Sequence, residues 1–283
     1  YGVMAANLDD LELAERIYNP GESNDRIVGS AGNDSYEFIV QAFESPVPDG
    51  DQSTAVSFDT GRDTVFDMGG NDDALVFSDA TIDDLKFEAV TVGRESENNS
   101  LKVSFSQEAT MDGGDQVTNK GELTWQGHFR EGGRQAAELV EVSDGLGGQG
   151  VSRYSIARTE YEYDAKGYVV EGSAKLAAGS AFDAIMVGKA DVDETDVFAF
   201  TADQNATNTE QTARIAGFDN GDLIDISDYV RAYGDADLAM DGSQVTFSRP
   251  EDVTDNFVLN LTFQGTAVVS HDDLEIALGL TVT

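Results

Sequence analysis

The sequence feature that most constrains the fold is a nine-residue spacing of aspartates within residues 21–77. Asp25 and Asp34 are nine residues apart, and Asp63 and Asp72 repeat this interval. Small or turn-forming residues precede each aspartate, and an apolar residue follows two positions after it: Ile27, Tyr36, Val65 and Ala74. Glycine permits the positive φ angles of tight turns. Each unit therefore fits a turn that ends in Asp, followed by a short strand with one inward side chain.

Two such units would make one coil of a parallel β-roll, so we expect a coil at 20–37 and another at 58–75, with 38–57 as an excursion between them. If the coils stack, Asp25 lies against Asp63, and Asp34 lies against Asp72. Carboxylates and turn carbonyls that converge in this way are the oxygen ligands of a hard cation such as Ca²⁺. The alternative is that these segments are ordinary Gly-Asn-Asp turns that bind no metal.

The charge balance favours a cationic partner. The chain has 54 Asp and Glu against 17 Lys and Arg, a net charge of −37. This balance argues against nucleic acid, whose binding depends on basic residues, and against an anionic membrane surface. Without cations the self-repulsion would destabilise the compact state. The chain is 40% hydrophobic, which argues against disorder, and no apolar run is long enough to span a membrane.

The expected architecture is all-β: a short parallel β-roll, or β-solenoid, with additional β-sheet elements and a short N-terminal helix. The helix is expected over 7–18, where apolar residues recur on one face, and it would cover the open end of the first coil. Strands are expected around 101–105, 122–125, 138–142, 245–247 and 257–263, and a hairpin around 164–167. The Gly-rich segment 144–150 predicts two domains, 1–147 and 148–283.

The second half holds weaker versions of the same pattern. Asp183 and Asp196 each precede an apolar residue by two positions, but they are 13 residues apart, so extra residues would bulge near Asp191 and Asp193. The segment 215–226 is a turn rich in carboxylate and amide oxygens between apolar strands. It is either a third cation site or a hydrated turn, with these candidate ligands: Asp219, Asn220, Asp222 and Asp225.

Residues 20–77, above all Gly-Asn-Asp-Ser-Tyr-Glu-Phe38 and Gly-Asn-Asp-Asp-Ala-Leu-Val-Phe77, resemble the RTX family of hemolysin-type calcium-binding repeat proteins. Segments 82–145 and 181–229 are similar to regions that accompany such repeats. The resemblance implies a roll that folds on binding calcium, and export to the bacterial cell surface or exterior. It departs from the family pattern where Phe58, Asp59 and Asp67 replace glycines. Under this resemblance the metal-site residues are Asp25, Asp34, Asp63, Asp72, Asn24, Asn33, Asn71, Gly21, Gly32, Gly61, Gly70 and Asp222.

Signs of catalysis are few in the sequence. The two histidines, His128 and His271, form no His-Glu-x-x-His motif, and neither a Gly-x-Ser-x-Gly elbow nor a P-loop occurs. Residues 120–134 form the one basic and aromatic patch. There Trp125 could stack on a sugar or peptide ring while Arg130 and Arg134 bind a carboxylate. The alternative is that Trp125 belongs to the core and the arginines pair locally.

The function expected from these observations is a non-enzymatic, secreted calcium-binding module of a bacterial extracellular protein. Its folding would depend on calcium, and its role would be adhesion or assembly of a surface layer, matrix or filament. Its partners would be calcium ions and a glycan, a peptide or further copies of the chain. The alternative is a calcium-stabilised module of a secreted hydrolase or glycan-modifying enzyme.

Overall fold

The computed structural model describes a little over half of the chain in short ranges. These are residues 16–18, 24–38, 44–45, 54–55, 58–70, 72–90, 92, 100–110, 116–129, 137–143, 150–156, 159–163, 169–176, 183–188, 196–200, 209–218, 222–226, 229–230, 232, 237–241, 243–248 and 257–264. Several residues singled out above lie outside these ranges: Gly21, Asn71, Arg130, Arg134, Asp191, Asp193, Asp219, Asn220 and His271.

The chain divides into two compact units, one of residues 1–85 and 100–152 and the other of residues 86–99 and 153–283. The described residues of both units are mostly β-strand, so the all-β prediction is confirmed. Their helical residues are confined to η1 (Ile82–Asp84) and to positions 229, 230 and 232. No helix in the described ranges has the length and apolar character needed to cross a membrane.

The N-terminal helix is not found where it can be checked. Strand β1 (Arg16–Tyr18) occupies the end of the expected helix and pairs in parallel with β3 (Asp34–Glu37). The free edge of β3 offers unpaired backbone groups, and an Ile-Tyr pair suits a strand, so pairing outweighs the helical pattern here. The prediction is therefore wrong for 16–18, while 7–15 lie outside the described residues.

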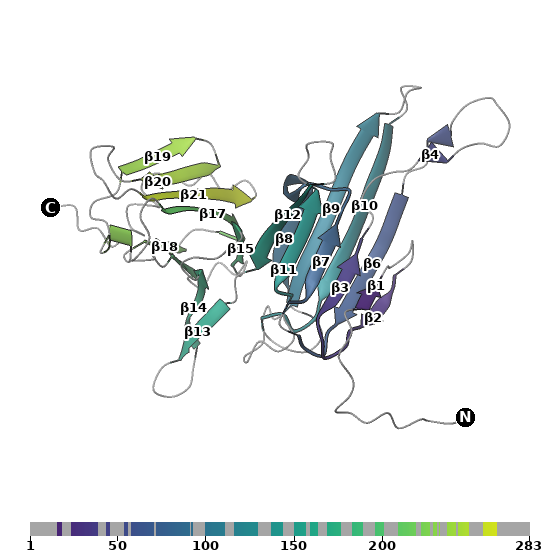
Figure 1. Cartoon of the computed structure of the whole chain (residues 1–283), viewed down its shortest axis with the longest axis horizontal. Coiled ribbons are helices and arrows are strands. Elements are labelled where there is room, and N and C mark those ends of the chain that lie inside the picture. The colour runs from purple at the N-terminus through teal and green to yellow at the C-terminus, as the bar shows by residue number, and fades with distance from the viewer. Residues whose placement is uncertain are drawn as a thin grey trace. The chain divides into compact units, whose positions relative to one another are not determined.

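In the first unit the chain alternates between two sheets (Figure 1). One sheet has parallel strands in the order β1, β3, β7 (Ala74–Phe77) and β11 (Leu139–Ser143). The other has β2 (Arg26–Val28), β6 (Phe58–Phe66) and β10 (Gln116–Trp125) in parallel, with β9 (Ser100–Thr110) antiparallel to β10. Successive strands of the chain, β2 then β3 and β6 then β7, thus enter different sheets. Residues at the ends of neighbouring parallel strands are thereby brought into register.

Strand β6 differs from the expected turn followed by a short strand. It runs without interruption from Phe58 to Phe66, because β10 is long enough to pair with all of it. Gly61 takes up the extra residue: its φ is 88°, and the register with β10 shifts at this point. Glycine adopts such a positive φ without strain. Asp63 therefore lies within a strand and not at the end of a turn.

The two sheets of the first unit pack through aromatic side chains. The rings of Tyr36 on β3 and Trp125 on β10 meet edge to face, with centroids 4.9 Å apart. Phe77 on β7 stacks on Phe38 at 5.3 Å and meets Phe105 on β9 at 6.2 Å. Aromatic pairs of this kind add about 0.5–1.5 kcal/mol each beyond the area that they bury. The short pair β4 (Glu44–Ser45) and β5 (Thr54–Ala55) lies in the expected excursion.

The second unit also alternates between two sheets. One contains β12 (Val151–Ile156), β15 (Asp183–Val187), β17 (Thr209–Ala216) and β21 (Phe257–Gln264) in parallel, followed by the antiparallel β20 (Gln244–Ser248) and β19 (Asp237–Asp241). The other contains β14 (Val169–Leu176), β16 (Asp196–Phe200) and β18 (Leu223–Asp225) in parallel, with β13 (Thr159–Tyr163) antiparallel to β14. The β13–β14 pair confirms the predicted hairpin.

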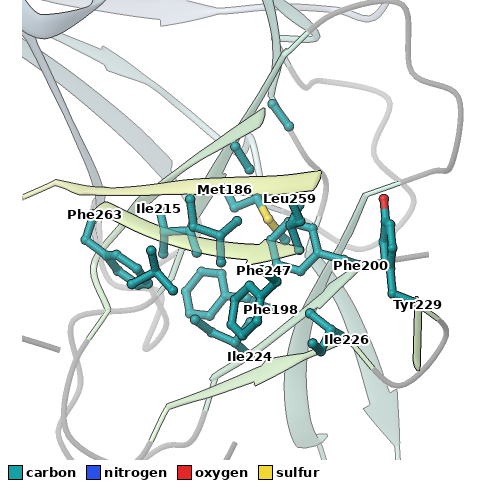
Figure 2. Packing of buried hydrophobic residues seen from close by; sticks show 14 of the residues in the cluster. Met186, Phe198, Phe200, Ile215, Ile224, Ile226, Tyr229, Phe247, Leu259 and Phe263 are labelled. Carbon is teal, nitrogen blue, oxygen red and sulfur yellow. The ribbon is translucent and has the colours of Figure 1, made fainter. Parts of the chain in front are cut away.

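The core of the second unit lies between these two sheets. Phe198 and Ile224 come from the smaller sheet, and Phe247, Leu259 and Met186 come from the larger one (Figure 2). All five are buried. Along β21 every second residue is buried, which confirms the alternation expected over 257–263.

Candidate metal centre

Acidic residues at the starts of parallel strands are linked by a ladder of backbone-to-carboxylate hydrogen bonds. The backbone N–H of Asp34, the first residue of β3, donates to Oδ1 of Asp73 at 2.8 Å. The N–H of Asp73, just before β7, donates in turn to Oε2 of Glu138, just before β11, at 2.9 Å. Register explains the ladder: Ser35 pairs with Ala74, and Ala74 pairs with Leu139, so the acidic residues one position earlier are neighbours.

The neighbour of Asp34 is therefore Asp73 and not Asp72, as the nine-residue spacing predicted. Asp72 is exposed, and its Oδ2 accepts a hydrogen bond of 3.3 Å from the side-chain amide of Asn33. The register follows the side chains that must be buried, since a slip of one residue would turn each strand's inward face outward. Leu75, two residues after Asp73, is fully buried beside Tyr36 on the paired strand.

Three buried carboxylates come together at this edge of the first unit. Asp34, Asp67 and Asp73 are 1%, 3% and 0% exposed, and each offers a carboxylate oxygen within 4.8 Å of the others. Asp67 follows the last residue of β6 and was not among the expected ligands. The sequence pattern treated it as a departure, because the repeat would have glycine there. The sequence carries no local signal for this role, because it depends on the pairing of β6 with β2.

Local hydrogen bonds hold the three carboxylates in place. Asp34 accepts from the backbone N–H of Ser30 at 2.5 Å and from the Ser30 hydroxyl at 3.0 Å. Asp67 accepts from the N–H of Gly69 at 2.5 Å and from the hydroxyl of Tyr36 at 3.0 Å. Asp73 accepts through Oδ1 from Asp34, but its buried Oδ2 accepts from no N–H or O–H donor. One oxygen of the centre is thus buried without the hydrogen bond that it requires.

The electrostatics of the centre disfavour three ionised carboxylates. Burial raises the pKa of Asp73 to about 8, and the negative charges of Asp67 and Glu138 add to this, against the lowering effect of the Asp34 N–H. Burial also raises the pKa of Asp67, although the N–H of Gly69 and the hydroxyl of Tyr36 lower it. Burial and the Asp67 charge raise the pKa of Tyr36, which keeps its hydroxyl a donor.

No Lys or Arg forms a salt bridge with these three carboxylates in the part of the chain that the structure describes. Asp67 and Asp73 are close enough to share a proton, and this hydrogen bond adds to the rise in the pKa of Asp73. Buried carboxylates this close need a positive charge between them, because their charged forms are disfavoured both by burial and by each other. A shared proton or a bound cation meets that need.

The opposite edge of the first unit holds a simpler pair. Asp25 lies against Asp63, as expected: its backbone N–H donates to Oδ1 of Asp63 at 2.9 Å. Beside them Arg62 donates its N–H to Oδ1 of Asn24 at 2.8 Å. On the next parallel strand, however, the residue in register with Asp63 is Leu123. The register thus supplies no third acid here, and burial raises the pKa of Asp63 to about 6.

The other expected glycines lie in turns near the centre. The N–H of Gly32 donates to the Ser30 hydroxyl at 3.1 Å, within the loop that presents Asp34. A Cβ on Gly70 would lie 2.5 Å from Oδ1 of Asp73, so a side chain at this position would displace the carboxylate. Gly61 instead forms the bulge in β6.

In the second unit Asp222 takes part in the same kind of ladder. The N–H of Asp196 donates to Oδ1 of Asp222 at 2.8 Å, and both residues are buried. Asp225, the last residue of β18, is half-buried. Asp183, at the start of β15, is largely exposed. Partial desolvation of its carboxylate and the charge of Glu210 raise its pKa, against the lowering effect of Arg214.

The expected ligand patch around Trp125 is corrected. Trp125 is 0% exposed and packs against Tyr36, so its ring is not available to stack on a sugar or peptide. This agrees with the alternative that placed it in the core. His128 is also buried: its Nδ1 accepts from the N–H of Ala137 at 3.1 Å, and its ring meets Phe129 edge to face.

No family model, curated protein or solved structure matches this chain. The resemblance to calcium-binding repeat proteins therefore stays a prediction that rests on the motifs in residues 20–77. The geometry of the candidate centre stands independently of it, since that geometry follows from strand register, burial and hydrogen bonding.

Proposed function

We propose that the chain is a non-enzymatic calcium-binding module whose first unit folds fully only when a divalent cation occupies the centre of Asp34, Asp67 and Asp73. The single observation that carries this proposal is Oδ2 of Asp73, a fully buried carboxylate oxygen with no donor. It belongs to a cluster of three buried acids that no basic side chain compensates in the described part of the chain. A hard cation would supply the missing positive charge.

The chemistry of the centre favours calcium over other metals. Its candidate ligands are oxygens only, which suits Ca²⁺ or Mg²⁺ and not the softer transition metals. Calcium–oxygen distances of about 2.3–2.6 Å place opposite ligands roughly 5 Å apart, whereas Mg²⁺ at about 2.0–2.1 Å needs a tighter octahedron. The three carboxylate oxygens lie within 4.8 Å of one another, inside the span of the wider sphere.

We further propose that the alternating strands of the first unit are the coils of a short parallel β-roll. The pairs β2–β3 and β6–β7 would be successive coils, and β10–β11 would be a third. Two facts support this: the strands of successive pairs are parallel within each sheet, and inside each pair the chain passes from one sheet to the other. The acidic ladder would then be the line where successive turns stack, and calcium would bind across it.

The proposed setting is the exterior of a bacterial cell, in a protein that adheres or assembles into a layer, matrix or filament. Extracellular calcium modules bind with a Kd of about 10⁻⁴–10⁻³ M, so such a site would be empty before export and filled afterwards. At 100 times Kd one bound ion stabilises the folded state by about 2.7 kcal/mol. A net charge of −37 makes the unfilled chain dependent on such compensation.

Calorimetric titration with Ca²⁺ and with Mg²⁺ tests the proposal, together with thermal unfolding followed by circular dichroism. We expect saturable calcium binding, a higher midpoint of unfolding in calcium than in chelator, and weaker binding of Mg²⁺. Equal thermal stability in calcium and in excess EGTA would reject the proposal. Light scattering in the same two conditions tests calcium-dependent assembly separately.

A further inference from the structure

The second unit contains a place that corresponds to the candidate centre, residue by residue. In the first unit Gly29, after β2, stands beside Asp67, after β6, because the residues before them are paired. In the second unit Gly188, after β15, stands beside Gly217, after β17, in the same way. Each of Gly29 and Gly188 donates its N–H to the carbonyl oxygen of the residue before that neighbour, at 2.8 Å.

The acidic ladder is also present in both places. Asp34 donates its N–H to Oδ1 of Asp73, and Asp196 donates to Oδ1 of Asp222, both at 2.8 Å. In both units the first acid's carboxylate faces the glycine: a Cβ on Gly29 would lie 3.1 Å from Asp34 Oδ2, and one on Gly188 would lie 2.8 Å from Asp196 Oδ2. The two units therefore share the backbone arrangement and two of the three carboxylates.

The corresponding places in the two units differ at two residues. Gly217 stands where the first unit has Asp67, and Phe198 stands where it has Tyr36, two residues after the first acid. Gly217 has a φ of 75°, and a Cβ there would lie 2.6 Å from the carbonyl oxygen of Gly188. A side chain at 217 is thus excluded by both backbone conformation and space. The second unit lacks the third carboxylate and also the hydroxyl that would hold it.

We infer that, of these two corresponding places, only the one in the first unit binds a divalent cation, and that Asp67, held by Tyr36, makes the difference. This inference rests on the proposed function and adds which half of the chain responds to calcium. In the first unit the third acid converges with the other two around the donorless oxygen of Asp73. Among the described residues, Asp34, Asp67 and Asp73 are the group of acids that converges in this way.

Tyr36 acts on the cation through Asp67 and is a positioning residue. Its hydroxyl donates to Oδ1 of Asp67, while the N–H of Gly69 holds Oδ2, so both oxygens have a fixed direction. Each carboxylate oxygen can still accept a second interaction, so a cation can bind without breaking either hydrogen bond. Phe198 keeps the buried ring in the second unit but carries no hydroxyl to orient an acid. With Gly217 in place of Asp67 and Phe198 in place of Tyr36, the second unit lacks both the third carboxylate and the hydroxyl that would orient it.

Terbium luminescence on the full chain tests the inference, since Tb³⁺ takes the same oxygen ligands as Ca²⁺ and is excited through nearby Tyr and Trp rings. The centre lies next to Tyr36, whose ring meets that of Trp125 at 4.9 Å. We expect sensitised emission that calcium abolishes by competition. Asp67→Asn should weaken the competing calcium affinity at least about tenfold, because it removes a charged ligand. The matched variant Asp222→Asn should leave that affinity within about twofold of the parent.

Tyr36→Phe separates positioning from a merely structural role. We expect about tenfold weaker calcium affinity, as for other residues that orient metal ligands. A structural role alone would lower the unfolding midpoint equally with and without calcium and leave the affinity unchanged, which would overturn the part of the inference that concerns Tyr36. Far-UV circular dichroism verifies folding, and Asp67→Glu, which keeps the charge, should recover part of the affinity lost in Asp67→Asn.

The outcomes distinguish this inference from the proposed function. If Asp222→Asn weakens calcium binding as much as Asp67→Asn, the inference is overturned and the chain remains a calcium-binding module. If the parent chain binds neither Tb³⁺ nor Ca²⁺, the proposed function and the inference fail together. Loss of affinity in Asp67→Asn alone supports both.

Discussion

The backbone N–H of Asp34 and the carboxylate of Asp73 form a 2.8 Å hydrogen bond between neighbouring parallel strands. This bond occupies one oxygen of Asp73 and leaves the other buried without a donor. Among the described residues the same relation joins three more pairs: Asp25 with Asp63, Asp73 with Glu138, and Asp196 with Asp222. Stacked strand starts thus gather carboxylates as a consequence of register, and a compensating charge is required where a third acid joins them.

The variant Asp73→Asn should fold more stably than the parent without calcium and should no longer be stabilised by calcium. Without calcium we expect it to be more stable than the parent, on the order of 1–3 kcal/mol, because an amide N–H can donate to Asp67 and the centre holds one buried acid fewer. With calcium we expect the stabilisation of about 2.7 kcal/mol at 100 times Kd to be lost. Urea unfolding in calcium and in chelator measures both differences.

Asp72→Asn is the matched control, since the change is the same one residue earlier. Asp72 is exposed and interacts with the side chain of Asn33. Surface substitutions of this kind change stability by less than about 0.5 kcal/mol. An Asp72→Asn variant that loses the calcium effect while Asp73→Asn keeps it would restore the nine-residue spacing as the guide to the ligands.

Stability without calcium should fall as the pH rises from mildly acidic to alkaline values. The pKa of Asp73 is raised from 3.8 to about 8, chiefly by burial, so between these values the folded state binds more protons than the unfolded state. Stability then decreases with rising pH across this window. Asp63, with a pKa raised to about 6 by burial, acts in the same direction.

The measurement is the urea midpoint in calcium-stripped buffer at a series of pH values across this window. Repulsion between the many other acidic groups also lowers the urea midpoint as the pH rises. The parent is therefore compared with Asp73→Asn, whose urea midpoint should decrease less across the same pH window. Saturating calcium should also reduce the decrease, because the cation replaces the proton. A parent and a variant with the same slope would contradict the raised pKa of Asp73.

Removing the acid at the opposite edge should leave calcium binding in place. Asp63→Asn keeps the shape of the side chain and an oxygen that can accept from Asp25. Among the described residues no third carboxylate joins Asp25 and Asp63 at this edge, whereas Asp67 joins Asp34 and Asp73 at the centre. We expect calcium to raise the midpoint of thermal unfolding by the same amount as in the parent. Calorimetry should give the same number of bound calcium ions per chain. Loss of one calcium equivalent would show that both edges bind.

The sequence predicted the fold class and the contact of Asp25 with Asp63, because periodic apolar residues and turn formers are local properties. It missed the shift from Asp72 to Asp73, since the register depends on which side chains of two distant strands are buried together. It missed Asp67 for a related reason. Its role arises only when the end of β6 is brought beside Gly29 and Tyr36.

The ligand patch shows a different limit of sequence reasoning. Trp125 lies among charged residues in the sequence, yet it is fully buried, because β10 pairs with strands on both sides and turns this face inward. The expected N-terminal helix failed at 16–18 because the strand β3 offers a pairing edge that no local pattern reveals. In both cases a nonlocal partner decided the outcome.

Gly29→Ala should disrupt the centre by steric clash. A Cβ at this position would lie 2.1 Å from the hydroxyl oxygen of Tyr36 and 2.2 Å from Oδ1 of Asp67, so the hydrogen bond between these two groups could not keep its place. Overpacking of this kind costs about 1–3 kcal/mol. Displacing Asp67 should also weaken calcium binding. Ala31→Ser, at an exposed position of the same turn, should change stability by less than about 0.5 kcal/mol. Thermal unfolding in calcium and in chelator measures both effects, and a Gly29→Ala variant with the full calcium increment would show that Asp67 is not needed at the centre.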